Sequence, residues 1–227
     1  MMKSILNPVH RVFAPGCALM IYKPGMARKV NQWLNDHIGP VPELVTCCKH
    51  EPLVQPGTEV INICPGCDKR FGNNYPATST ISLWEILAQA DDFQFPDYQG
   101  RNMTILDACP TRERTAVHDS IRILIHRMNI NLIEPAKTRT RGTCCGDSFY
   151  GVLPVQDVKV QMTRRASDMP CEEVVVYCVS CVKAMAIGGK HPRYLLDLLF
   201  GEATDPGITD PDEWHSQLDH YINEPGH

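Results

Sequence analysis

The positions of the cysteines constrain this chain more than any other feature of its sequence. Ten of the eleven cysteines follow one order twice: a lone cysteine, an adjacent pair, and then a Cys-x-x-Cys motif. The first cysteine set is Cys17, Cys47, Cys48, Cys64 and Cys67. The second cysteine set is Cys109, Cys144, Cys145, Cys178 and Cys181, and only Cys171 falls outside both. A repeated order of this kind indicates two similar halves.

The sequence around the cysteines repeats as well. Residues 59–71 read EVINICPGCDKRF, and residues 173–185 read EVVVYCVSCVKAM. Downstream of each motif, residues 79–92 and 191–205 are both apolar enough to predict a helix at the same place in each half. We interpret these matches as the result of a duplication.

The pattern of apolar residues predicts an α/β fold with parallel sheets. Residues 11–17 form a short apolar run that ends at Cys17, and residues 26–38 then carry apolar side chains at helical spacing. Residues 103–110 and 117–128 repeat that order, with Pro110 suited to a first helical turn. Further strands are predicted at 43–48, 59–64, 131–137 and 173–178. Because most of these runs stop at a cysteine, the cysteines should gather at the carboxyl ends of the strands, where open parallel sheets bind ligands.

Length and composition suit one domain or two small similar ones. The chain has 227 residues, of which 43% are hydrophobic, which is enough for a buried core without metal or disulfide staples. We predict a shortened first half at residues 1–100 and a second half at 101–204. The acidic segment 205–227 is expected to be a turn-rich surface tail or a contact with a partner.

Charge and targeting signals limit the partners. The formal net charge is −4, so no basic footprint predicts binding to nucleic acid or to an anionic membrane. The first residues lack the apolar run of a signal peptide, and no stretch of eighteen apolar residues predicts a membrane span. We therefore expect a cytoplasmic protein, in which many thiols more often bind metal or perform redox chemistry than form disulfides.

The spacing of the cysteines suits iron and sulfur. A Cys-x-x-Cys motif where a strand meets a helix brings two thiolates together under the first N–H groups of the helix. The pair and the lone cysteine then complete a set with more soft ligands than the four a metal site needs. Gly146 permits the turn that lets Cys144 and Cys145 face one centre. Buried structural thiols are the alternative, and Cys171 is expected to be an ordinary thiol.

A basic segment precedes the second pair. Residues 137–142 read KTRTRG, and an extended backbone there would place Lys137, Arg139 and Arg141 on one side. The segment is a solvated loop, or it offsets the negative charge of a cluster or holds an anionic substrate.

The repeated order of a cysteine, a cysteine pair with glycine, and Cys-x-x-Cys resembles the CCG-domain proteins, the family that includes the cysteine-rich reductase component of heterodisulfide reductase. The resemblance runs from Cys17 to about Glu202 and is most specific in the second cysteine set. It implies that Cys109, Cys144, Cys145, Cys178 and Cys181 hold a noncubane [4Fe-4S] cluster and form the catalytic centre. It also implies a disulfide substrate that is reduced one electron at a time.

The first cysteine set departs from the family pattern. Lys49 follows its pair in place of glycine, and 15 residues separate Cys48 from Cys64, against 32 between Cys145 and Cys178. We therefore expect a helix to be missing from the first half. Its five cysteines are predicted to hold a second cluster or zinc.

Three functions follow from these patterns. The first is an iron–sulfur redox subunit that reduces a disulfide or passes electrons. Since no Gly-x-Gly-x-x-Gly turn or phosphate loop is present, its electrons would come from a flavin- or ferredoxin-like partner subunit. The second is a zinc-stabilised interaction module without catalytic activity. The third is a metal-free dithiol oxidoreductase, which explains neither the cysteine pairs nor the repeat.

Overall fold

Two parallel sheets organise the molecule, and the α/β fold predicted from the sequence is confirmed. The computed structural model describes residues 10–224. The first sheet has the order β1-β2-β3, from β1 (Arg11–Ala14), β2 (Glu59–Asn62) and β3 (Ser79–Ser82). The second has the order β5-β4-β6-β7, from β4 (Arg101–Leu106), β5 (Ile130–Ile133), β6 (Glu173–Val176) and β7 (His191–Tyr194). Every neighbouring pair of strands runs parallel.

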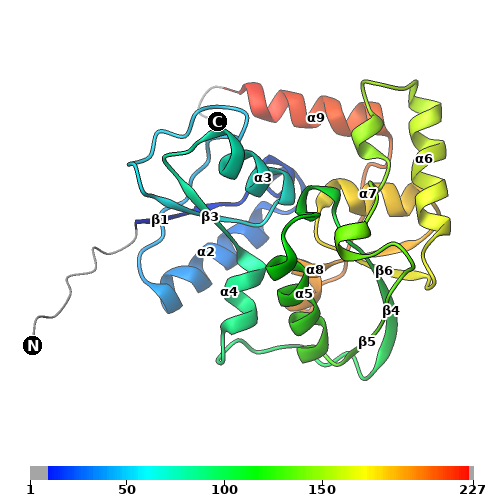
Figure 1. Ribbon diagram of the computed structural model, residues 1–227, viewed down its shortest axis with the longest axis horizontal. Helices are drawn as coiled ribbons and strands as arrows, with labels where there is room; N and C mark the ends of the chain where they lie inside the picture. The colour runs from blue at the N-terminus through cyan, green and yellow to red at the C-terminus, as the bar shows by residue number, and fades with distance from the viewer. Residues whose placement is uncertain (1–9, 225–227) are drawn as a thin grey trace, which may run out of the picture.

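Helices flank both sheets (Figure 1). The first half contains α1 (Cys17–Tyr22), α2 (Pro24–Ile38), α3 (Pro65–Asn74) and α4 (Leu83–Gln89). The second half contains α5 (Thr115–Arg127), α6 (Val155–Ser167), α7 (Val179–Ile187) and α8 (Leu195–Leu199), with the short 3₁₀ turns η1 (Cys109–Thr111), η2 (Arg139–Arg141) and η3 (Asp147–Phe149). A last helix, α9 (Pro211–Asn223), follows both halves.

The two long helices predicted from the spacing of apolar residues are confirmed. Met26, Val30 and Leu34 are buried along one face of α2, and Pro24 occupies its first turn, where a missing N–H costs nothing. Ile121 and Leu124 are buried in the same way on α5. Pro110 is not in α5, because η1 takes it up as a separate turn before the helix begins at Thr115.

The first half has only a trace of the strand that β5 provides in the second. Residues 43–48 were predicted to form a strand, but they make a single parallel bridge, from Glu43 to Phe13 of β1. Leu44 N donates to Phe13 O at 2.7 Å, and Phe13 N donates to Pro42 O at 2.9 Å. Pro42 has no N–H for a ladder and the chain bends at Thr46, so the pairing stops there. The bridge lies beside β1, as β5 lies beside β4.

The segments predicted as helices at 79–92 and 191–205 each begin with a strand instead. Residues 79–82 form β3 and residues 191–194 form β7, and α4 and α8 follow directly. In β3 the β-branched Thr80 and Ile81 pair with β2, and Ser82 then caps α4. In β7, Pro192 is accommodated because the strand lies at the edge of its sheet. In both halves, a four-residue strand therefore comes directly before a shorter helix than predicted.

The helix expected to be missing from the first half is missing. Between Cys48 and β2, residues 49–58 contain turns but no helix, whereas α6 occupies the equivalent interval in the second half. The shorter spacing between the pair and the Cys-x-x-Cys motif therefore reflects the absence of one helix from residues 49–58.

Two ion pairs at matching positions join the halves. Lys23, the N-cap of α2, pairs with Asp197, the third residue of α8, at 2.7 Å. Arg114, the N-cap of α5, pairs with Glu85, the third residue of α4, at 2.9 Å. Each half thus offers a cation to the same position of the other half. Two similar units that face each other make such contacts, although the duplication itself stays a prediction.

The C-terminal segment is a packed helix, and the prediction of a turn-rich surface tail was wrong. Asp210 caps α9 by accepting from Asp212 N at 3.1 Å and Glu213 N at 3.2 Å, and Pro211 opens its first turn. Trp214 and Ile222 are buried because their spacing puts them on one face. The helix contacts α1 of the first half and α6 of the second (Figure 1). The final residues, 225–227, lie outside the described part.

Residues 1–9, on which the expectation about a signal peptide was based, also lie outside the described part of the chain. Within residues 10–224, no helix combines the length and the apolar character that crossing a bilayer requires.

Candidate functional site

Six of the ten repeated cysteines, the two lone ones and the two Cys-x-x-Cys motifs, come directly after the carboxyl ends of strands, whereas the two adjacent pairs lie in longer loops. Cys17 begins α1 after β1, and Cys109 begins η1 after β4. Cys64 is the N-cap of α3 after β2, and Cys178 is the N-cap of α7 after β6. Parallel pairing brings these strand ends to one edge of each sheet, so each set converges there.

Two glycines permit close approaches at the cysteine sets, Gly16 to a cysteine sulfur and Gly146 to helix α6. Gly16 has φ 78°, and a Cβ added to it would lie 3.2 Å from Cys67 Sγ. Gly146 has φ 113°, and its Cβ would lie 2.6 Å from Met162 Cγ and 2.8 Å from Met162 N, on α6. Only glycine fits either position without strain. The turn predicted at Gly146 is therefore present.

The first cysteine set forms a continuous chain of sulfur contacts. Cys17 and Cys48 both act on the pKa of Cys47, and Cys67 acts on the pKa values of Cys48 and Cys64. The hydrogen bond to Cys47 raises the pKa of Cys17 far above its usual value and that of Cys48 to about 12. The bonds from Cys17 and Cys48 lower the pKa of Cys47 to about 2. Within this set, Cys47 is the cysteine whose pKa is lowered most.

The second cysteine set repeats that chain in the same order. Cys109 and Cys145 donate to Cys144, and Cys181 donates to Cys145 and contacts Cys178. The bond from Cys109 comes first among the causes that lower the pKa of Cys144 strongly. The same contact raises the pKa of Cys109. Cys144 is thus the counterpart of Cys47, and the first cysteine of each pair carries the thiolate.

Neutral donors add to this stabilisation. Cys144 Sγ accepts from Gly146 N at 3.3 Å and from Ser148 Oγ at 2.9 Å. Cys47 Sγ accepts only from Lys49 N, at 3.5 Å, among the described donors outside its set. After the bond from Cys67, the N–H groups of Gly66 and Cys67 at the start of α3 help lower the pKa of Cys64 to about 7. The second pair therefore has the better-supported thiolate.

Burial separates the two pairs. Cys47 and Cys48 are both buried, with 5% and 8% of their surface exposed. In the second pair Cys145 is buried to a similar degree, but Cys144 is only half-buried. A small molecule can therefore reach the thiolate of the second set more easily than that of the first.

The sulfur donors of both sets suit a metal, but their positions in the described chain do not form a metal site. Each set offers five sulfurs, one of them already a thiolate, and such donors fit soft metals and iron–sulfur clusters. Yet within residues 10–224, no three His, Cys, Asp or Glu side chains form a group that could hold a metal ion. The cluster expected in the second set, and the cluster or zinc expected in the first, stay predictions.

Cys171 stands apart from both sets. It lies just before β6 and is half-buried, and burial is the first cause that raises its pKa. This placement agrees with the ordinary thiol expected from the sequence.

The basic segment before the second pair is not extended, and its three cations do not share a side. Residues 139–141 form η2, with Arg139 at φ 54°. The carboxylate of Asp107 holds this segment in its 3₁₀ turn, because it accepts from Arg139 N at 2.6 Å and from Thr138 Oγ1 at 2.9 Å. Arg139 pairs with Asp119 of α5, and Arg141 is exposed. Lys137 lines a cavity that also contains Cys144.

A buried polar network behind Cys109 was missed from the sequence. Tyr177 Oη lies 3.2 Å from Asp107 Oδ1, 2.9 Å from Thr111 Oγ1, and accepts from Ala108 N at 2.9 Å. Burial works to raise the pKa of Asp107, but the hydrogen bonds from Arg122 outweigh it and lower that pKa to about 2. The signal was available, because Asp107 and Tyr177 are polar residues that directly follow apolar strands.

A buried tyrosine lies near both sets. Burial raises the pKa of Tyr194, and the charges of Cys64 and Cys178 raise it further. Its ring meets that of Tyr22 edge-on at 5.6 Å, and Tyr22 Oη donates to Asp197 at 2.6 Å. One cysteine from each Cys-x-x-Cys motif therefore acts on the pKa of Tyr194.

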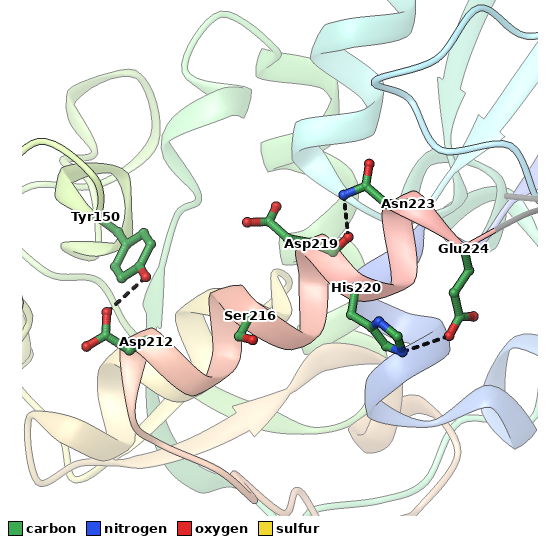
Figure 2. A pocket seen from close by; sticks show the side chains of 7 residues that line it. All are labelled: Tyr150, Asp212, Ser216, Asp219, His220, Asn223 and Glu224. Carbon is green, nitrogen blue, oxygen red and sulfur yellow. Dashed lines mark hydrogen bonds and ion pairs between the residues drawn. The ribbon is translucent and has the colours of Figure 1, made fainter.

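A cavity of about 730 Å³ lies away from both cysteine sets. Figure 2 shows its lining along α9, with Tyr150 donating to Asp212 at 2.9 Å. The lining is acidic and includes no cysteine. Smaller cavities contain sulfur: one of about 190 Å³ is lined by Cys144, and one of about 240 Å³ by Cys109.

Comparisons with known proteins do not identify a family. No protein-family model matches the chain, and no curated protein matches it. Among solved structures, an aspartate racemase from Picrophilus torridus is similar over 93% of this chain and 94% of its own, with 8% sequence identity and a TM-score of 0.32. A likeness at this level carries no argument about function.

Proposed function

We propose that this protein is an iron–sulfur redox subunit whose reactive centre is the second cysteine set. The observation that carries the proposal is that five thiols in each half make the same chain of contacts in the same order, each at the carboxyl edge of a sheet. The resemblance to CCG-domain proteins points the same way.

The residues that would hold a noncubane [4Fe-4S] cluster are Cys109, Cys144, Cys145, Cys178 and Cys181. Such a cluster, when bound, supplies electrons one at a time to a disulfide. The chain itself stabilises anionic sulfur: Gly146 N–H and the Ser148 hydroxyl both donate to Cys144. Hydrogen bonds of this kind favour a more negative sulfur site.

The overall reaction in this proposal is the reduction of a disulfide to two thiols, which consumes two electrons and two protons. The electrons come from a flavin- or ferredoxin-like partner subunit, since the sequence has no nucleotide-binding fingerprint of its own. A reducing cytoplasm is the matching location, because it keeps the ten thiols available as ligands.

The first cysteine set fits a supporting role better than a catalytic one. Both cysteines of its pair are buried, so a substrate has little access to its thiolate. We propose that it passes electrons through a second cluster, or stabilises the first half through zinc. If zinc occupied both sets, the protein would be an interaction module without catalytic activity.

The test is elemental analysis of protein purified without oxygen. We expect brown protein that contains iron and acid-labile sulfide, and a Cys171→Ser control that keeps both, because Cys171 lies outside the two sets. Colourless protein with stoichiometric zinc would overturn the redox proposal and leave the interaction module.

A further inference from the structure

The cavity beside Cys144 has a composition that the redox proposal alone does not explain. It has a volume of about 190 Å³ and lies between α6, residue Lys137 and the loop that carries the second pair. Sites for whole drug-sized ligands occupy about 300–1,000 Å³. A cavity of this size therefore suits one small group of a larger ligand.

Cations dominate its lining. The lining has three cationic side chains, Lys137, Arg164 and Arg165, and one carboxylate, Asp168, so its net charge is +2. Neither Lys137 nor Arg164 has a side-chain ion pair or hydrogen bond within the described residues 10–224, and both are exposed. Their charges are therefore available to a ligand.

Arg165 is held in place at the back of this lining. Its side chain is only 3% exposed, with Nη2 donating to Lys137 O at 3.0 Å and Nη1 to Asp168 Oδ2 at 3.3 Å. Its Nε is buried and has no partner among the described residues. A buried guanidinium with one weak, half-exposed counter-ion is costly unless an anion completes its surroundings.

The element that builds this wall is the one the first half lacks. Arg164, Arg165 and Asp168 come from α6 and its C-terminal cap, and residues 49–58 of the first half form no helix. No equivalent wall is therefore built against Cys47 in the described chain, and the cations belong to the accessible thiolate of the second set.

We propose that this cavity is an oxyanion subsite, which binds a carboxylate or phosphate group of the small molecule that reacts at the second cysteine set. The proposal rests on the redox function proposed above, and it adds the substrate class: a small thiol or disulfide that carries an oxyanion. Lys137 and Arg164 supply the mobile charges, and Arg165 supplies the fixed one. Guanidinium groups bind such oxyanions through paired hydrogen bonds.

The experiment is calorimetric titration of the full chain, purified without oxygen in a low-salt buffer, with inorganic phosphate and separately with malonate. The test variant is Lys137→Gln with Arg164→Gln, two exposed positions at which loss of folding is not expected. The control is Arg28→Gln with Arg70→Gln, which removes the same charge from exposed positions on α2 and α3.

We expect saturable binding of at least one probe, with a Kd that rises about tenfold or more in the test variant and stays unchanged in the control. The probe that binds more tightly tells whether the subsite prefers phosphate or carboxylate. Equal affinity in the test variant and the wild type would overturn the assignment, as would the absence of saturable binding for both probes.

Iron and sulfide analysis of the same samples separates this inference from the proposed function. Iron-loaded protein that binds neither probe would remove the subsite and leave the redox function. Protein that binds a probe at this cavity but contains no iron would remove the redox function and leave an anion site.

Discussion

The first half of the molecule places its cysteine pair after a single β-bridge, whereas the second half places the equivalent pair between a full strand and helix α6. Both halves nevertheless make the same chain of five sulfurs. The order of the sulfurs therefore depends on the strand ends and on the two helix N-termini, which the halves share.

What the halves do not share determines access and charge. In the second half, the pair is followed by Gly146 and packs against α6, which leaves Cys144 half-buried beside a cationic cavity. In the first half, Lys49 follows a fully buried pair. The comparison is the basis of our proposal that the second set reacts and the first supports it.

The largest effect should come from breaking each pair in turn. Cys145→Ser removes a sulfur that contacts both Cys144 and Cys181, in the set that has the glycine turn. We expect it to abolish most of the cluster signal in electron paramagnetic resonance and most of the disulfide-reducing activity, while Cys48→Ser retains more of both. Equal losses, or the reverse order, would contradict the division of roles.

The position after each pair offers a matched test of backbone geometry. Gly146→Ala forces a Cβ into Met162 at a positive φ, so we expect a loss of about 3 kcal/mol in the free energy of unfolding. Lys49→Ala, at the equivalent position of the first half, should change that free energy by less than about 0.5 kcal/mol, since its ion pair with Asp219 is exposed. Urea denaturation of the metal-free proteins measures both.

A similar midpoint for the two variants would mean that the glycine turn and α6 are not coupled. The two halves would then differ less than their geometry indicates.

The smallest expected difference between the halves lies in how the free energy of unfolding depends on pH in acid. The Arg122 hydrogen bonds depress the pKa of buried Asp107 from 3.8 to about 2, so the carboxylate stabilises the fold above about pH 4, and this contribution disappears as the pH falls through about 2. The shift corresponds to about 2 kcal/mol. Pro15 occupies the equivalent place in the first half and has no charge to lose.

Asp107→Asn should therefore lower the free energy of unfolding by about 2 kcal/mol at pH 7 and reduce its decline between about pH 4 and pH 2. Chemical denaturation at several pH values checks this. If the free energy of unfolding of the variant fell with pH as it does in the wild type, the network behind Cys109 would not make the second half more sensitive to acid than the first.

Local patterns in the sequence predicted much of this architecture. The spacing of apolar residues identified α2 and α5, and the cysteine spacing identified the edge of each sheet and the absence of a counterpart to α6. Each of these features is set by residues close to one another in the chain.

Features that depend on distant partners were not predicted. Residues 79–82 and 191–194 are strands because β2 and β6 lie beside them. The composition of these two segments alone is equally compatible with a helix. The segment 139–141 turns because Asp107 accepts from it. Helix α9 packs against the rest of the molecule because Trp214 meets Ser180 and Lys183 of α7, and Ile222 joins the buried cluster that contains Cys47 and Cys48. Tertiary contacts of this kind override local propensity.

The most direct test of the central claim is Mössbauer spectroscopy of protein grown on ⁵⁷Fe, compared between wild type, Cys171→Ser, and a variant with both Cys109 and Cys145 changed to serine. We predict sulfur-coordinated iron in the wild type and in Cys171→Ser, and loss of the larger share of that signal when the second cysteine set is disrupted. Wild-type protein without sulfur-coordinated iron, or a full signal in the disrupted variant, would contradict the account.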